Sequence, residues 1–293
     1  MNPLLAAWLC WAVIGFSSVV GKYAASVVSP ALLVFLGCLT ALGFLSPWLS
    51  KNCQWGVLFA KEYRFSWWII GTLGTAVPFT ILLWALHYTT PGNAAILQQT
   101  ELIYSLIFSA VFLKEKITPK QLLACLLIAG GAVLILLKEK YRAHWVGDLM
   151  IIGSVWTLQA ASCTAKKLPH HLDPRVITAA RSLYALPLLI VLCLFTAAKN
   201  SLFLEPGRLL AVVLIYTGLL KYSAAMIWWY RAIGRLPLSK VTAIYLSYPI
   251  LTLLLSSVLG LEKIHTYQWV GLALTLAGAY WISFIIVKEQ EKQ

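Results

Sequence analysis

The sequence predicts an all-α membrane protein with ten transmembrane helices, arranged as two inverted five-helix repeats. Three observations support this fold class: an apolar composition, a series of apolar runs long enough to cross a bilayer, and an internal duplication. Of the 293 residues, 60% are hydrophobic and 11% are charged, whereas a soluble domain usually carries about 25% charged residues. The composition therefore indicates a membrane protein with no room for a soluble catalytic domain.

The duplication can be seen without introducing a gap. Residues 85–131 return as residues 232–278, at an offset of 147 positions (262 minus 115). The clearest match aligns Glu115, Lys116 and Ile117 with Glu262, Lys263 and Ile264. Such self-similarity marks a repeated structural unit and is typical of membrane transporters. We expect the first repeat to cover residues 1–140 and the second to cover residues 141–293.

Each expected helix is an apolar run of roughly 20 residues, the length that spans a bilayer. In order, the expected helices are 3–23, 30–49, 65–87, 91–113, 120–137, 145–165, 175–197, 207–231, 237–260 and 266–287. Five crossings per repeat is an odd number, so the second repeat must enter the membrane upside down relative to the first.

Basic residues in the connections indicate the orientation in the membrane. The connection LKEKITPK in the first repeat holds three lysines, whereas its counterpart LEKIHTY holds one, and cytoplasmic loops are the ones enriched in Lys and Arg. We therefore expect a multi-pass protein of the cell (inner) membrane with both termini in the cytoplasm. This orientation also explains the formal net charge of +13, so no nucleic-acid partner is expected.

The sequence contains no pattern that indicates catalysis or a cofactor. His170, His171 and Asp173 resemble metal-ligand spacing only loosely, and nothing supplies further ligands. The six cysteines lie in or beside apolar runs without paired spacing, which is typical of small core residues. There is no P-loop, no G-x-S-x-G and no pair of catalytic carboxylates. We expect no metal, no cofactor and no enzymatic activity.

Two polar stripes occupy equivalent positions in the two repeats. The fourth expected helix carries Gln98, Glu101, Ser105 and Ser109, and the ninth carries Tyr245, Tyr248, Thr252 and Ser256 at the same offset. Polar stripes inside a bilayer must face protein or water rather than lipid. The sequence therefore predicts a central cavity between these two helices.

Glu101 and Lys221 are charged residues expected near the middle of the membrane, where an unpaired charge is costly. Three interpretations are open: a structural ion pair between the repeats, a substrate site for a zwitterion or organic ion, and a protonation site at Glu101 that couples transport to a proton gradient. Arg181 is expected to extend towards the inner surface, and His87 is expected at the outer interface.

Four aromatic residues, Trp11, Trp156, Tyr245 and Tyr248, are expected deep in the membrane. They could stack on a flat or cationic ligand, and a role in the packed core is an equal alternative. The candidate substrate-binding residues are therefore Gln98, Glu101, Lys221, Tyr245, Tyr248, Trp11 and Trp156.

The chain resembles the drug/metabolite transporter superfamily, in its EamA-type ten-helix form. The resemblance is carried by the segments FLKEKITPKQLLACLLIAGGAVLIL and GLEKIHTYQWVGLALTLAGAYWIS. Pro249 matches a proline that the family favours in the ninth helix, whereas Leu102 stands at the corresponding position of the fourth. Glu115 and Glu262 belong to the motif, and we interpret them as loop or helix-cap residues.

The resemblance implies a secondary carrier that exports or exchanges small metabolites such as amino acids. It also implies that the first, third, fourth, sixth, eighth and ninth helices surround the cavity. Two other classes remain open: a lipid-handling protein or membrane enzyme that uses the same cavity, and a structural partner subunit. Expected partners are a small metabolite, membrane lipid and a second copy, since Ala273 and Ala277 could pack in a homodimer.

Overall fold

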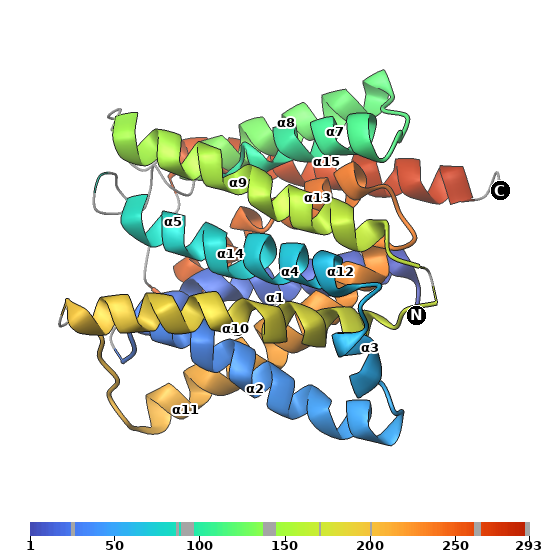
Figure 1. Cartoon of the computed structure of the whole chain (residues 1–293). Coiled ribbons are helices and arrows are strands. Elements are labelled where there is room, and N and C mark those ends of the chain that lie inside the picture. The colour runs from blue at the N-terminus through green and yellow to red at the C-terminus, as the bar shows by residue number, and fades with distance from the viewer. Residues whose placement is uncertain are drawn as a thin grey trace.

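The computed structural model describes residues 1–24, 27–85, 88, 97–136, 145–169, 171–199, 201–260 and 265–290. Over these ranges the regular elements are helices, and the single exception is an isolated β-bridge between Val28 and Leu204. The helices run alongside one another as a bundle (Figure 1), with the start of α1 and the end of α15 at the same end of it. We call this the terminal end of the bundle.

The first half of the chain contains seven described α-helices and one π-helical segment. They are α1 (Pro3–Ala24), α2 (Pro30–Lys51), α3 (Trp55–Phe59), α4 (Arg64–Gly71), η1 (Thr72–Ala76, π-helical), α5 (Val77–Ala85), α7 (Glu101–Phe112) and α8 (Pro119–Leu136). The short helix α3 lies in a connection for which the sequence predicts no helix.

The second half follows a similar order of elements, in which the short helix α3 has no counterpart among the described residues. It contains α9 (Trp145–Lys166), α10 (Pro174–Ala198), α11 (Arg208–Ile215), η2 (Tyr216–Ala224, π-helical), α12 (Ala225–Ile233), α13 (Leu238–Leu246), α14 (Pro249–Val258) and α15 (Thr266–Gln290). The helices α8 and α15 pack together at one edge of the bundle, and α2 and α11 lie at the opposite edge (Figure 1).

Six helical segments in the described ranges are long and apolar enough to cross a membrane, by length and composition. They are Pro30–Lys51, Trp145–Lys166, Pro174–Ala198, Arg208–Ile233, Leu238–Leu255 and Thr266–Glu289. Pro3–Ser17, Glu101–Phe112 and Pro119–Ile135 are shorter apolar helices. The prediction of an all-helical protein with membrane-spanning segments is confirmed at this level.

The fourth predicted helix is not continuous, which corrects the expected range of 91–113. Gln99 and Thr100 form a turn, α7 begins at Glu101, and residues 91–96 lie outside the described part of the chain. The ninth predicted helix is interrupted between Leu246 and Pro249. Because 100 plus 147 is 247, the two interruptions fall at equivalent places. The break in the second half is followed by Pro249, and the break in the first half is followed by Leu102 at the equivalent position.

The π-helical segments are also equivalent. Adding 147 to residues 72–76 of η1 gives 219–223, which lies inside η2. A π-helical turn widens the helix and displaces the usual i to i+4 hydrogen bonds, and such turns are frequent at functional sites. Each half therefore carries a π-helical segment in its third expected helix and a break in its fourth expected helix.

Close contacts between the halves are reciprocal. A Cβ atom placed on Gly131 in α8 would lie 2.6 Å from the carbonyl oxygen of Gly271 in α15, and one on Gly278 would lie 2.8 Å from the carbonyl oxygen of Ala124. The offset of 147 converts the first pair into the second. Each half therefore presents equivalent positions to the other half.

The same glycines give a matched test of this packing. We expect Gly131→Ala to destabilise the protein by about 1–3 kcal/mol because the added methyl group must push α8 and α15 apart. Gly130→Ala adds a methyl group where nothing lies within 4 Å, and alanine favours a helix over glycine. Thermal unfolding of the purified protein should therefore shift to lower temperature only for Gly131→Ala. Equal midpoints for the two variants would contradict the close contact.

Candidate functional site

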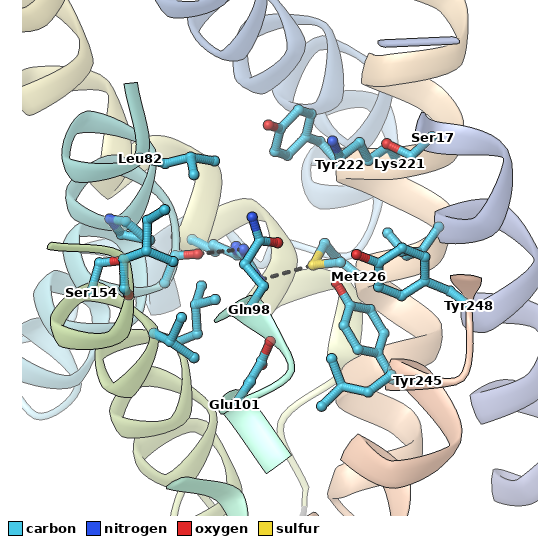
Figure 2. A pocket seen from close by; sticks show the side chains of 18 residues that line it. Ser17, Leu82, Gln98, Glu101, Ser154, Lys221, Tyr222, Met226, Tyr245 and Tyr248 are labelled. Atoms are coloured by element: carbon cyan, nitrogen blue, oxygen red, sulfur yellow. Dashed lines mark hydrogen bonds between the residues drawn. The ribbon is translucent and has the colours of Figure 1, made fainter. Parts of the chain in front are cut away.

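A cavity of about 340 Å³ lies inside the bundle between the two halves. Its wall is formed by α1, η1, α5, α7, α9, α10, η2, α12, α13 and the residues beside them. The polar and charged residues that line it are Ser17, Gln98, Glu101, Ser154, Arg181, Lys221, Tyr222, Tyr245 and Tyr248. We call this space the central cavity (Figure 2).

The backbone irregularities of both halves lie at this cavity. Gly74 of η1 and Lys221 of η2 line it, and so do Glu101 and Tyr248, which stand at the starts of α7 and α14. Irregular backbone is tolerated at membrane depth where it is buried in protein or lines a cavity. The π-helical turns and helix breaks therefore shape the wall of one site.

Glu101 lies in the first turn of α7 and is buried, with 8% of its surface exposed. Its Oε1 accepts a hydrogen bond of 2.7 Å from Nε2 of Gln159, a fully buried residue of α9. A carboxylate in the first turn is also favoured by the positive end of the helix dipole. The site thus holds one carboxyl group in a fixed position.

Lys221 lines another part of the same wall. Its Nζ lies 5.6 Å from the centre of the Tyr222 ring, and Figure 2 shows Lys221 beside Ser17 and Tyr222. Glu101 lies well apart from it in the same view. The structural ion pair between Glu101 and Lys221 is therefore not the arrangement seen in this structure, and the two charges face the cavity separately.

Arg181 of α10 also lines the central cavity, so the expectation that it extends to the inner surface is wrong. Its Nε donates to Oγ1 of Thr75 (2.7 Å), and its Nη2 donates to the carbonyl oxygen of Gly74 in η1 (2.6 Å). Its Nη1 contacts Sδ of Met226 (2.8 Å) and the hydroxyl of Tyr230 (3.4 Å). The polar atoms of the π-helical segment thus hold the guanidinium within the bundle.

This arginine keeps capacity for a ligand. Four of its five N–H groups are used in these contacts, and one of the acceptors is a sulfur, which binds hydrogen weakly. The remaining N–H group on Nη2 can donate to a carboxylate or phosphate group, and the weak sulfur contact of Nη1 can be exchanged for a second hydrogen bond to the same group. Arg181 is therefore an anion-binding candidate at a position where the sequence pattern predicts a side chain directed to the inner surface.

The two polar stripes divide along their length. Gln98, Glu101, Tyr245 and Tyr248 line the cavity, and the Tyr245 and Tyr248 rings lie 6.1 Å apart. Ser105 donates to the carbonyl oxygen of Leu102, Ser109 accepts from the backbone N–H of Ser239, and Thr252 donates to the carbonyl oxygen of Gly15. The side chain of Ser256 lies outside the described part. Half of each stripe therefore faces the cavity, whereas Ser109 joins α7 to α13, Thr252 joins α14 to α1, and Ser105 bonds within α7.

The two candidate tryptophans lie away from the cavity. Trp11 packs against Trp8, with ring centres 5.2 Å apart, and against the cluster around Ile250. Trp156 is 42% exposed on the outside of α9. Neither lines the central cavity, whereas Gln98, Glu101, Lys221, Tyr245 and Tyr248 are brought together there.

The terminal end of the bundle is fastened by a polar network. Oε1 of Glu115 accepts from Nζ of Lys166 (2.9 Å) and from the backbone N–H of Leu238 (3.0 Å). Nζ of Lys166 also donates to the carbonyl oxygen of Leu236. Glu115 thus caps the start of α13, as a helix-cap residue does. His87, His170 and Glu262 lie outside the described residues.

Within the described residues, no group of three or more His, Cys, Asp or Glu side chains could hold a metal ion. The apolar helices and the internal cavity lined by charged residues define the class: a multi-pass membrane protein with a polar site inside its helical bundle. The sequence profile of the EamA-like transporter family matches residues 2–137 and again residues 145–284. The chain belongs to this family, and the predicted resemblance is confirmed.

Its relatives carry transporter names. An uncharacterized transporter, YyaM, of Bacillus subtilis (strain 168) is 26% identical over 74% of this chain and 72% of its own. YetK of the same organism is 26% identical over 92% and 83%, and an uncharacterized transporter of Archaeoglobus fulgidus is 25% identical over 86% and 87%. A protein of known crystal structure superposes with a TM-score of 0.79, at 16% identity and with 98% of each chain covered. This last similarity concerns the fold.

Proposed function

We propose that the protein is a secondary active carrier that exports or exchanges small amphipathic metabolites, such as amino acids, across the cell (inner) membrane. One observation carries the proposal: the central cavity contains a carboxyl group, a guanidinium and an ammonium group inside the bundle, contributed by both halves. Ionisable residues at membrane depth are costly, and they usually mark a substrate or ion pathway. In this proposal the chain acts as a carrier and not as an enzyme.

The arrangement of charges suits a zwitterion. Glu101 can bind the ammonium group of the substrate, and Arg181 or Lys221 can bind its carboxylate, because all three side chains line the same cavity. The remaining wall includes Ile14, Leu82, Val155 and Leu158, which favours an apolar substrate side chain. Hydrophobic amino acids therefore fit the cavity by charge and by polarity.

Alternating access would use two inverted halves, residues 1–140 and 141–293, with ten crossings in total. The reciprocal glycine contacts, the paired π-helical segments and the paired helix breaks support this arrangement. Inverted repeats with discontinuous helices at the midplane allow one half to rock against the other around a fixed site. The start of α1 and the end of α15 lie at one end of the bundle (Figure 1), which agrees with the proposal of two cytoplasmic termini.

The test is flux through the purified protein in proteoliposomes. Labelled leucine, glutamate, lysine and phenylalanine are supplied one at a time, with and without a proton gradient. We expect saturable uptake of at least one hydrophobic amino acid and stimulation by the same compound on the opposite side. Movement of labelled phospholipid between leaflets without any flux of solute would instead favour the lipid-handling alternative.

A further inference from the structure

A second, larger cavity of about 610 Å³ lies between α9, α10 and α12 and the connections beside them. It is lined by Met1, Ala165, Lys166, Leu168, Pro169, Leu172, Pro174, Ile177, Tyr230, Arg231, Gly234 and Arg235. We call it the basic cavity, since all of its charged side chains are Lys or Arg. It is at the terminal end of the bundle, because α9 and α12 end there and α10 begins there (Figure 1).

The two cavities follow one another along the same helices. On α10, Ile177 lines the basic cavity and Arg181, about one turn further on, lines the central cavity. On α12, Met226 lines the central cavity and Tyr230, again about one turn on, lines the basic cavity. The contacts of Arg181 with Met226 (2.8 Å) and Tyr230 (3.4 Å) lie between the two spaces. One layer of side chains therefore separates them.

The basic cavity carries excess positive charge. Lys166 is paired with Glu115, so its charge is balanced. Arg231 and Arg235 have no carboxylate within ion-pair distance in the part of the chain that the structure describes. Three cations minus one carboxylate leave a net charge of +2 around this space. Such a concave positive site attracts anions and raises their local concentration.

Basic residues at a cytoplasmic helix end are commonly explained by membrane orientation alone. That explanation requires only that Arg231 and Arg235 lie on the cytoplasmic side, and it does not require them to surround an open space one layer from Arg181. Membrane orientation is a sufficient explanation for Arg64, because this residue is exposed at the start of α4 and lines neither cavity.

We propose that the basic cavity is a second binding station of the transport path, which holds the anionic group of the substrate beside Arg231 and Arg235 before or after its contact with Arg181. This inference rests on the proposed carrier function and narrows the substrate class to solutes that carry a carboxylate or another anionic group. The contact between Arg181 and Tyr230 is the barrier that such a group must cross between the stations.

The electrostatic part is tested with two thiol reagents of opposite charge, sulfonatoethyl and trimethylammonioethyl methanethiosulfonate. Ala165 lines the basic cavity, so the reporter protein carries Ala165→Cys together with Cys53→Ser. The reference is measured separately in the wild-type protein, where the native thiol of Cys53 is exposed after α2. We expect the ratio of anionic to cationic reagent rates to be about tenfold higher at Ala165→Cys than at Cys53.

Adding Arg231→Gln and Arg235→Gln should lower this ratio to that of the reference thiol, whereas Arg64→Gln should leave it unchanged. A ratio that is unaffected by the double substitution, or a reporter thiol that reacts with neither reagent in folded protein, would overturn the proposal. The proposal would also be overturned if the ratio of anionic to cationic reagent rates were high in phosphatidylcholine vesicles and fell to the reference value when phosphatidylglycerol was added. That result would identify an anionic lipid headgroup as the occupant of the basic cavity.

The role of the basic cavity in transport is tested by measuring KM for two compounds, N-acetyl-leucine, which is anionic, and leucine methyl ester, which is cationic. In the double variant we expect KM for the anion to rise about tenfold relative to KM for the ester. Equal changes for both probes would contradict a station for anionic groups. If the wild-type protein moved no solute at all, the carrier function would fail instead, and the reagent ratios would still report the charge of the cavity.

Discussion

Replacing Arg181 by Gln is expected to raise KM for leucine about 100-fold while leaving the transport of leucine methyl ester nearly unchanged. The guanidinium is held by Thr75 and Gly74 at the wall of the central cavity, where it can bind a carboxylate. Removing one partner of a buried, hydrogen-bonded charge pair typically costs 2–5 kcal/mol, and about 2.7 kcal/mol corresponds to a factor of 100. The ester has no carboxylate and therefore loses no such partner. Uptake kinetics in proteoliposomes measure both compounds.

Two further variants separate binding from folding. Arg181→Lys keeps the charge but loses the bidentate fork, so its KM for leucine should fall between those of the wild type and Arg181→Gln. Arg175→Gln changes an arginine on the same helix that stacks on Trp48 at 4.7 Å and lines neither cavity, and it should transport leucine normally. If Arg181→Gln reduced the transport of acid and ester in equal proportion, Arg181 would have only a structural role.

Replacing Glu101 by Gln is expected to abolish accumulation driven by a proton gradient, with a loss of about 100-fold or more, and to leave the rate of exchange at saturating substrate within a few-fold of wild type. A glutamine cannot gain and lose the proton that coupling requires, while its carbonyl oxygen can still accept the hydrogen bond from Gln159. The measurement compares accumulation under an imposed pH gradient with counterflow of labelled leucine in the absence of a gradient.

Glu205→Gln is the matched control for this substitution. Glu205 is exposed in the connection before α11 and lines neither cavity, so its variant should accumulate substrate as the wild type does. Normal accumulation by Glu101→Gln would remove Glu101 from coupling. Loss of exchange at saturating leucine together with accumulation would contradict the prediction, because the charge of Glu101 would then be needed for substrate movement itself and not for proton coupling.

The helical fold follows from features that are local in the sequence. Apolar runs bounded by basic connections predict helices, and the matched segments at an offset of 147 predict two similar halves. The break before Pro249 has a local signal, because proline favours the start of a helix. The equivalent break at Gln99 and Thr100 contains neither proline nor glycine, so it depends on tertiary packing that single-sequence patterns do not report.

The candidate site was predictable where a polar residue interrupts an apolar helix. Gln98, Glu101, Lys221, Tyr245 and Tyr248 all stand out in this way, and all line the central cavity. The number of residues between a polar side chain and the helix end indicates its depth, but the direction in which the helix face points depends on packing. Trp156 is deep in its helix and nevertheless faces outward.

Arg181 was misplaced for a related reason. It lies two turns into α10, and from that depth a long side chain can reach the membrane surface. In the structure, the π-helical turn of η1 presents the Gly74 carbonyl oxygen and Thr75 to the guanidinium. The π-helical turn is a backbone distortion with no reliable sequence signature, so the anchoring of Arg181 could not be foreseen.

The most direct test of the central claim is the accessibility of the cavity from each side of the membrane. A Gln98→Cys variant in the Cys53→Ser background places a thiol in the wall of the central cavity. An impermeant thiol reagent is applied to one side of the membrane at a time. If the protein is a carrier, the thiol should react from both sides, and leucine should slow both reactions. When a leucine gradient is imposed, the rate of modification should rise from one side and fall from the other. A thiol that reacts from neither side, or that reacts at rates leucine does not alter, would contradict the account.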